Sequence, residues 1–111
     1  MPDLDPEDEK LITLARSARA RTQAAEGAAV RDTDGRTYVA TTVELPSLKL
    51  TALQAAVAAA VSSGVESLEA AVVVTEENTV QEVSVRAVRD LAAQAPILRA
   101  DSSGTVQETL R

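Results

Sequence analysis

This 111-residue sequence contains no His and no Cys, so the side chains that could do chemistry are mainly carboxylates, hydroxyls and arginines. Without imidazole or thiolate groups, zinc sites built on them, cysteine nucleophiles and His-based triads are excluded. Glu76 and Glu77 are adjacent carboxylates that could act together in hydrolysis or hold a divalent cation. Asn78 and Thr79 follow them, however, and this composition is typical of a solvated loop. Hydrolysis by carboxylates alone therefore stays as a third hypothesis for the function.

Two other charged groups have both a functional and a structural interpretation. Asp32 and Asp34, followed by Gly35, match the first positions of a calcium-binding loop, but the later positions and its bidentate Glu are missing. We therefore expect a tight turn there. A second group could form an anion site near a helix N-terminus, although separate surface arginines are the commoner arrangement. This group consists of Arg86, Arg89 and Arg99.

The composition predicts one globular domain, residues 1–111, whose core needs no disulfide or metal. Apolar residues make up 45% of the chain and charged residues 25%, and a chain of this length buries roughly 65% of its unfolded surface. The net charge is −6 and Tyr38 is the only aromatic residue, so neither phosphate attraction nor base stacking favours nucleic-acid binding. No apolar run approaches the roughly 20 residues of a membrane span. We expect a cytoplasmic protein without nucleic-acid or membrane partners.

Capping and turn residues predict the first elements. Asp5 followed by Pro6 is typical of a helix start, and apolar residues at helical spacing continue this helix to about Gln23. Strands are expected at residues 27–30 and 36–44, and the Asp-Gly turn between them should make an antiparallel hairpin.

An alanine-rich helix is predicted next. Pro46 ends the second strand, Ser47 or Thr51 can cap the helix, and Gly64 stops it after Ser63. We expect it to be buried on several sides, because alanines leave almost no polar face beside its apolar stripe. That stripe consists of Leu50, Leu53, Val57, Ala60 and Val61.

The rest of the chain completes an α/β fold. Residues 68–75 form a continuous apolar run typical of a central strand covered on both faces. A helix at about 83–95 precedes strands at 96–101 and 105–110, whose four-residue link is too short for a crossover and makes them antiparallel. The order α-β-β-α-β-α-β-β predicts a mixed five-stranded sheet between helices in three layers, α/β/α.

Several fragments, in this order and at this spacing, resemble a known family. They are Gly27-Ala28-Ala29, Asp34-Gly35-Arg36, Thr42-Val43-Glu44, Val61-Ser62-Ser63-Gly64, Ala70-Ala71-Val72-Val73-Val74 and residues 91–98. Together they are similar to the small homotetrameric cytidine deaminases over nearly the whole chain. The resemblance implies the cytidine deaminase-like fold for the single domain.

The same resemblance implies a degenerate catalytic site. The family carries a Cys-Ala-Glu or His-Ala-Glu motif at the start of its second helix and a Pro-Cys-x-x-Cys motif at the start of its third. By alignment on Gly64 and Pro96, its three zinc ligands fall on Thr51, Ser84 and Ala87. Its proton-shuttling Glu falls on Leu53. Neutral hydroxyls and a methyl group cannot replace thiolate or imidazole, so we expect no zinc and no other cofactor.

The nucleoside pocket of the resembled family is also incomplete. Its Asn-Val-Glu, which contacts the ribose, becomes Thr42-Val43-Glu44, and its stacking Phe falls near Ala24. The connection from Glu44 to the second helix is about two residues shorter by this alignment. Glu44 and Thr42 are therefore the remaining candidate ligand-binding residues. The hydroxyls of Thr51 and Ser84 could line the same pocket, or they could simply cap their helices.

The leading hypothesis is a catalytically inactive, zinc-free homologue of cytidine deaminase that acts as a structural or protein-interaction module. The alternative is a protein that binds a nucleoside or another small ligand through Glu44, Thr51 and Ser84. Small side chains on the helix from Leu50 to Val61 would let a second subunit approach closely, and in the resembled family this helix lies near the tetramer centre. We therefore expect a homo-oligomer, a dimer or tetramer; a different protein partner is not identified by the sequence.

Overall fold

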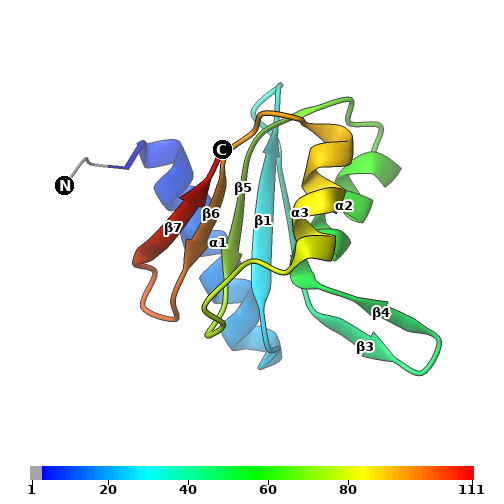
Figure 1. Ribbon diagram of the computed structural model, residues 1–111, viewed down its shortest axis with the longest axis vertical. Helices are drawn as coiled ribbons and strands as arrows, with labels where there is room; N and C mark the ends of the chain where they lie inside the picture. Colours follow the sequence, from blue (N-terminus) through cyan, green and yellow to red (C-terminus); the bar gives the residue numbers. More distant parts are fainter. Residues whose placement is uncertain (1–3) are drawn as a thin grey trace.

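Five strands form a mixed sheet in the order β2-β1-β5-β6-β7 in the computed structural model, which describes residues 4–111 (Figure 1). Helix α1 covers one face of the sheet, and helices α2 and α3 cover the other (Figure 1). The elements of the first half are α1 (Pro6–Thr22), β1 (Gly27–Asp32), β2 (Thr37–Thr41), β3 (Val43–Leu45) and β4 (Leu48–Leu50). Those of the second half are α2 (Ala52–Ser62), β5 (Leu68–Val74), α3 (Glu82–Leu91), β6 (Ile97–Ala100) and β7 (Val106–Leu110).

The pairing of the strands confirms the predicted α/β class and the three-layer arrangement. Strand β1 pairs antiparallel with both β2 and β5, and β5 pairs parallel with β6. The parallel pair is joined through α3, as a crossover requires. Strands β6 and β7 pair antiparallel across the short link that follows Ala100, as expected.

The capping residues that the sequence indicates are confirmed. The Asp5 carboxylate accepts a hydrogen bond from the Glu7 N–H, with Pro6 in the first helical position. Thr51 forms a capping box at the start of α2, in which its hydroxyl accepts from the Gln54 N–H and the Gln54 side chain accepts from the Thr51 N–H. These bonds satisfy N–H groups that a helix start leaves free.

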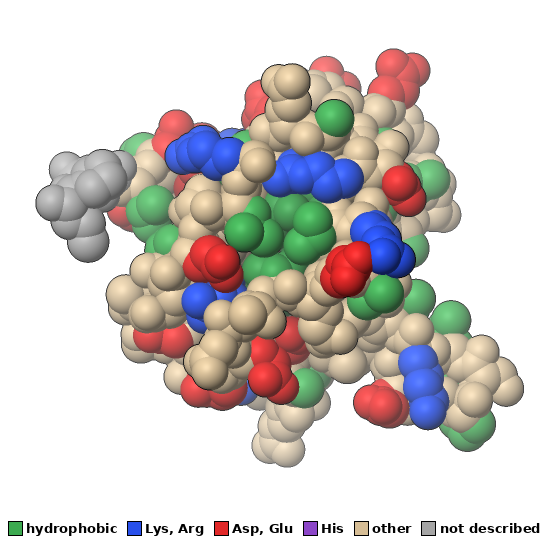
Figure 2. Space-filling model, in the orientation of Figure 1, with side chains coloured by type: hydrophobic (Ala, Val, Ile, Leu, Met, Phe, Trp, Pro, Cys, Tyr) green, Lys and Arg blue, Asp and Glu red, His purple; other side chains and the backbone are tan. Residues whose placement is uncertain are grey.

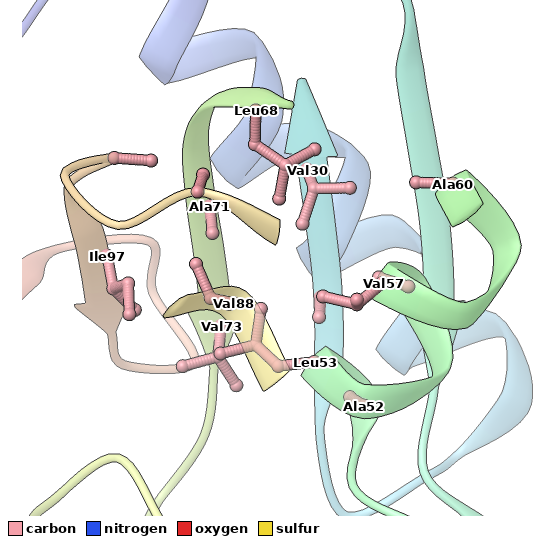
Figure 3. Close-up of a cluster of buried hydrophobic side chains, with 14 residues drawn as sticks. Val30, Ala52, Leu53, Val57, Ala60, Leu68, Ala71, Val73, Val88 and Ile97 are labelled. Carbon is pink, nitrogen blue, oxygen red and sulfur yellow. The ribbon is translucent and has the colours of Figure 1, made fainter. Parts of the chain in front are cut away.

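Two apolar clusters lie on the two faces of the sheet. The cluster under α2 and α3 includes Leu53, Val73 and Val88, which are fully or almost fully buried (Figure 3). The cluster under α1 includes Leu11 and Val72. Alternate residues of β5 contribute to opposite clusters, since successive side chains of a strand point to opposite faces.

An additional hairpin lies between β2 and α2, where the sequence predicted one long strand closed by Pro46. The chain leaves β2 after Thr41, and β3 pairs with β4 around Pro46 and Ser47. Pro46 therefore turns the chain inside a hairpin and does not merely end a strand, which agrees with the preference of Pro for turns. Figures 1 and 2 show this hairpin projecting from the body of the molecule.

Both later helices differ at one end from the prediction. Leu50 belongs to β4, so α2 begins only after Thr51, and Val61 is 52% exposed and not on the buried stripe. Helix α2 buries one side on the sheet and on α3, and leaves Ala58 and Ala59 exposed.

Helix α3 ends at Leu91, about one turn before the predicted end at Ala95. A guanidinium N–H of Arg89 donates to the carbonyls of Ala92 and Ala95, which holds the chain after the helix in a loop. Pro96 also disfavours helical backbone at the residue before it. Within residues 4–111, no helix is long and apolar enough to cross a membrane.

Candidate functional site

A cavity of about 700 Å³ opens at the edge of the sheet where β1 begins and where β2 and β5 end. This volume lies within the range of ordinary small-molecule sites. The starts of both α2 and α3 contribute to its wall through Thr51 and Gln81. Most of the lining residues carry polar or charged side chains, and Ala25, Val43, Leu50 and Val83 add apolar surface.

The floor of the cavity is a row of three polar residues on adjacent strands. Glu26 precedes β1, and its N–H donates to the Thr42 hydroxyl, 3.0 Å away. The Thr42 N–H in turn donates to the Glu26 carbonyl over 3.2 Å. Gly27 pairs with Val74 on the other side, which places Thr75 next to Glu26 across the sheet. Glu26 and Thr75 are both buried, with exposed fractions of 7% and 2%.

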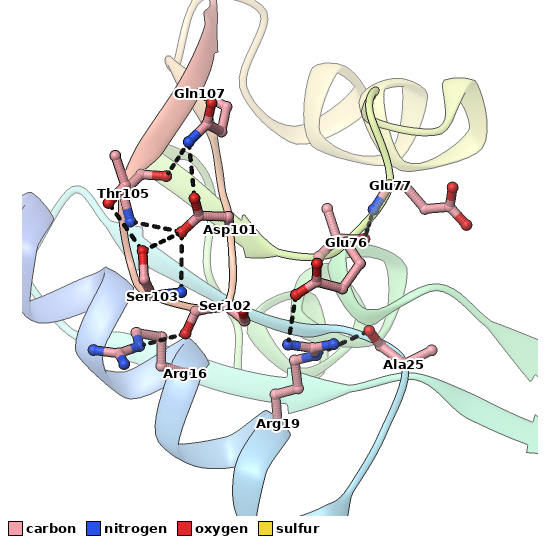
Figure 4. A network of polar contacts seen from close by, with 11 residues as sticks. Arg16, Arg19, Ala25, Glu76, Glu77, Asp101, Ser102, Ser103, Thr105 and Gln107 are labelled. Carbon is pink, nitrogen blue, oxygen red and sulfur yellow. Dashed lines mark hydrogen bonds and ion pairs between the residues drawn. The ribbon is translucent and has the colours of Figure 1, made fainter.

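The projecting hairpin and the loop after β5 supply the charged walls. Glu44 and Lys49 occupy paired positions on β3 and β4, and both line the cavity. Glu76 lies 3.7 Å from a guanidinium nitrogen of Arg19, whose Nε–H donates to the Ala25 carbonyl over 3.0 Å (Figure 4). Arg19 therefore fastens the end of α1 to the loop after β5.

The structure brings Thr51 and Ser84 into direct contact. Their hydroxyl oxygens lie 2.6 Å apart and share a hydrogen bond that joins the N-terminal turns of α2 and α3. Ser84 is only 3% exposed, and the Thr51 hydroxyl also accepts the capping bond from Gln54. Each hydroxyl is therefore satisfied by protein groups. Thr51 caps α2, as the structural interpretation predicts. The same interpretation is wrong for Ser84, which lies inside the first turn of α3, where Gln81 is the N-cap and no side chain caps the helix.

Leu53 and Ala87, the other two aligned positions, face the core. Leu53 is 0% exposed and belongs to the same cluster as Val73 and Val88. Ala87 is partly buried and packs against that cluster from α3. Neither residue carries a donor atom on its side chain, and neither lines the cavity.

The four aligned residues do not fit a zinc ion. The two hydroxyls are occupied by each other, Ala87 offers a methyl group, and Leu53 cannot relay a proton. Among the residues that the structure describes, no three His, Cys, Asp or Glu side chains gather into a possible metal site. The arrangement can hold two helix starts together, but it has no group that could activate water.

Thr42 and Glu44 line the cavity together with Thr51, so three of the sequence-predicted ligand-binding residues share one site. Ser84 lies behind Thr51 and is not part of the lining, and Ala24 belongs to a separate surface pocket beside α1. Glu76 and Glu77 are exposed, as a solvated loop requires, and both reach the cavity wall.

The three arginines that could have formed an anion site are dispersed. Arg86 forms an ion pair with Glu82 on the surface of α3, and Arg89 binds backbone carbonyls. The Arg99 side chain lies 3.0 Å from Glu108 and donates to the Glu77 carbonyl. Each arginine therefore has its own structural contact, as expected for separate residues.

The Asp32 segment is a turn, as predicted. Burial alone would raise the pKa of Asp32, but hydrogen bonds from the Arg36 N–H, the Tyr38 hydroxyl and the Asp34 N–H outweigh it and hold this pKa below its usual value. Gly35 follows with a φ of 86°, in the left-handed region that favours glycine.

A second aspartate organises the turn between β6 and β7. Hydrogen bonds from the Ser103 hydroxyl, the Thr105 N–H and the Ser103 N–H hold the pKa of Asp101 below its usual value (Figure 4). The two aspartates thus stabilise the two turns through the same kind of bond, and neither has the geometry of a catalytic group.

Glu26 and Thr75 were missed by the sequence analysis. The signal was present in the period-two pattern of β1, since Ala28 and Val30 face α2 and α3 and Glu26 is the next residue on the same side. A charged residue at that position lies at the end of the core, where the cavity opens.

The fold is a three-layer α/β/α sandwich with a mixed sheet and a cavity at the starts of two helices. The family model "Cytidine deaminase-like" matches residues 4–104, and the chain belongs to this family. No curated protein matches the chain.

Solved structures of cytidine deaminases have the same fold. The enzyme from Burkholderia pseudomallei is 22% identical with a TM-score of 0.80, and the match covers 91% of this chain and 89% of that one. The enzyme from Mycobacterium leprae is 22% identical with a TM-score of 0.73 and 93% of each chain covered. A mutant of the enzyme from Mycobacterium tuberculosis is 25% identical with a TM-score of 0.70, and the match covers 87% of this chain and 85% of that one.

Proposed function

We propose that this chain is a catalytically inactive, zinc-free member of the cytidine deaminase-like family that acts as a structural or protein-interaction module. The observation that carries the proposal is the contact between Thr51 and Ser84, two of the positions aligned with zinc ligands. Their hydroxyls satisfy each other where a deaminase would present thiolates or imidazole to a metal. The burial of Leu53 at the position aligned with the catalytic Glu supports the same conclusion.

Metal analysis and an activity assay test this proposal together. The protein is purified without a metal-binding tag, its zinc content is measured, and ultraviolet absorbance follows cytidine and deoxycytidine. We expect zinc far below one ion per chain and no turnover above a no-enzyme control. Stoichiometric zinc, or turnover that chelation abolishes, would refute it.

A second candidate function is the binding of a small ligand in the cavity without catalysis. It is favoured by one observation: Thr42, Glu44 and Thr51 line a single cavity of about 700 Å³. For pyrimidine nucleosides we expect a Kd weaker than about 1 mM, or about −4 kcal/mol, because metal, stacking ring and one ribose contact of the resembled family are replaced. Chemical-shift titration with cytidine and uridine measures this affinity. Saturable shifts around Glu44 and Thr51 at micromolar nucleoside would make nucleoside binding the leading function.

A further inference from the structure

Glu26 is a buried carboxylate that the fold does not use. Its backbone N–H and carbonyl are both hydrogen-bonded to Thr42. Its carboxylate makes no hydrogen bond or ion pair with any residue between 4 and 111. Every fully buried side-chain nitrogen or oxygen atom in this part of the chain has a hydrogen-bond partner. The Glu26 carboxylate oxygens are therefore not completely buried. Since Glu26 lines the cavity, these oxygens face that space. A charge held at 7% exposure without a partner is costly, so a ligand that pairs with it would be stabilised.

The charges around Glu26 favour a cation. Four carboxylates line the cavity, from Glu26, Glu44, Glu76 and Glu77. Only two basic side chains line it, and one of these, Arg19, is held by Glu76 and by the Ala25 carbonyl. Lys49 is the other, on the hairpin opposite Glu44. The cavity therefore carries an excess of negative charge, which raises the local concentration of cations.

The two helix starts at the cavity do not reverse this preference. The first N–H groups of α2 are partly satisfied by the Thr51 capping box. Gln81 makes no side-chain cap at the start of α3, but Glu82 places a negative charge in its first turn. An anion would therefore meet the capped start of α2, the first turn of α3 with Glu82 and its partner Arg86, and the Glu26 carboxylate.

We propose that the cavity binds a small organic cation whose ammonium or amidinium group pairs with the Glu26 carboxylate. A metal ion fits less well, because the acidic side chains of residues 4–111 do not converge in a group of three. The hydroxyls of Thr42 and Thr51 are already used in hydrogen bonds within the protein. The Glu26 carboxylate therefore supplies the polar contact to the ligand, and Leu50 and Val83 supply apolar contact. This proposal rests on the ligand-binding alternative and does not depend on whether the chain binds zinc.

Three isosteric probes separate charge from shape: benzamidine, which is cationic, benzamide, which is neutral, and benzoate, which is anionic. Benzylamine adds an ammonium group on the same ring. The probes are titrated into 15N-labelled full-length protein, and Kd is obtained from amide chemical shifts. We expect at least one of the two cations to bind ten- to a hundredfold more tightly than benzamide, because a hydrogen bond assisted by charge is that much stronger than a neutral one. The shifts should centre on Glu26, Thr42 and Thr75.

Two variants with the same change of net charge test the residue. Glu26→Gln should lose the preference for the cation over benzamide, whereas Glu66→Gln, at an exposed position outside the cavity, should keep it. Glu26→Gln should also raise the Tm of the free protein, because an unpaired buried charge is removed. A carboxylate with a purely structural role would lower the Tm when it is replaced.

Four results would overturn the proposal. The first two are equal affinity for cations and benzamide, and equal loss of the preference for the cation in Glu26→Gln and Glu66→Gln. The other two are shifts that centre away from the cavity, and absence of binding by both cations at millimolar concentration. The proposed loss of catalysis is judged separately by zinc content and turnover, so either conclusion can fail while the other stands.

Discussion

The hydroxyls of Thr51 and Ser84 lie 2.6 Å apart and link α2 to α3 at the two positions aligned with zinc ligands. In a metal site, the ion would hold these two helix starts together and contribute folding free energy. Here one hydrogen bond does so, together with the apolar contact of Leu53 and Val88 behind it. If the chain is zinc-free, as proposed, this contact takes over the structural role of the ion and holds the two helix starts together without Cys or His.

The Thr51–Ser84 bond should show as a coupling in a double-mutant cycle. Thr51→Val removes the helix cap and leaves Ser84 unpaired, so we expect a loss of about 1–3 kcal/mol in unfolding free energy. Ser84→Ala should cost about 1 kcal/mol, and the double variant should cost less than the sum by about 0.5–1 kcal/mol. Urea denaturation of the four proteins at one concentration measures these values.

The control for this cycle is Ser17→Ala on the exposed face of α1, where the change should stay within about 0.5 kcal/mol. Additivity of Thr51→Val and Ser84→Ala within about 0.3 kcal/mol would show that the two hydroxyls act independently.

Three thiols should be enough to create a metal site at this place. Ser84 and Ala87 are three residues apart on α3 and therefore share one face, and Ser84 contacts Thr51. We expect the variant Thr51→Cys, Ser84→Cys, Ala87→Cys to bind one zinc ion and to gain thermal stability from it. Cobalt absorbance reports the tetrahedral thiolate geometry, and Tm with and without zinc reports the gain.

The matched control moves the third thiol away from the site. Ala93 is exposed and lies beyond the end of α3, so Thr51→Cys, Ser84→Cys, Ala93→Cys should bind zinc more weakly. Turnover needs Leu53→Glu in addition, which places a carboxylate at a fully buried position and should lower stability. Equal zinc affinity of the two three-thiol variants would show that the aligned positions do not form the site.

The two turn aspartates should make stability depend on acid. The pKa values of Asp32 and Asp101 are lowered in the folded chain by the hydrogen bonds that their carboxylates accept. Their contribution to the free energy of unfolding is therefore fully present above the pKa of an aspartate in the unfolded chain, which is about 3.9. It is lost as the pH falls through the lower pKa of the folded state. We expect the variant Asp32→Asn, Asp101→Asn to be less stable than wild type at pH 7, and the difference to shrink toward pH 2.

Urea midpoints between pH 7 and pH 2 check this dependence. The control is Asp90→Asn at an exposed position of α3. Its urea midpoint should change with pH in the same way as that of the wild type. A constant difference between the turn variant and wild type at every pH would show that the carboxylates stabilise the turns by shape and not by charge.

Elements with a strong local signal could be predicted from the sequence. Asp5 and Pro6 fix the start of α1 through local capping, and the Asp-Gly turn fixes the β1–β2 hairpin, because these effects involve neighbouring residues only. The central strand β5 was equally clear from its unbroken apolar run. The order of these elements then predicted a mixed sheet between two layers of helices, and the resemblance to a family identified the particular fold.

Features that depend on tertiary contacts were predicted less well. The β3–β4 hairpin reads as a continuation of one strand, since only the pairing of Glu44 with Lys49 shows where the chain folds back. The early end of α3 depends on the Arg89 side chain reaching the Ala95 carbonyl. The place of Glu26 in the site depends on Thr42 and Thr75, which only the folded sheet brings to either side of it.

Self-association through α2 is the last prediction. Ala58 and Ala59 are exposed, Val61 is 52% exposed, and small side chains allow a second backbone to approach closely. Leu45 and Leu48 on the projecting hairpin are 55% and 49% exposed and add apolar surface. We expect light scattering at micromolar protein to give the mass of a dimer or tetramer, because a core without Phe or Trp gains stability from a further apolar interface.

Ala59→Glu should convert this oligomer into folded monomers, since an unpaired charge would be buried between subunits. Ala20→Glu makes the same change on the exposed face of α1, across the sheet, and should leave the mass unchanged. Ala55 is only 9% exposed within the subunit, so Ala55→Glu should instead unfold the chain. A monomeric wild type would refute self-association. An unchanged mass in Ala59→Glu would show that the interface does not lie on α2. Leu45→Lys and Leu48→Lys would then test whether it lies on the hairpin.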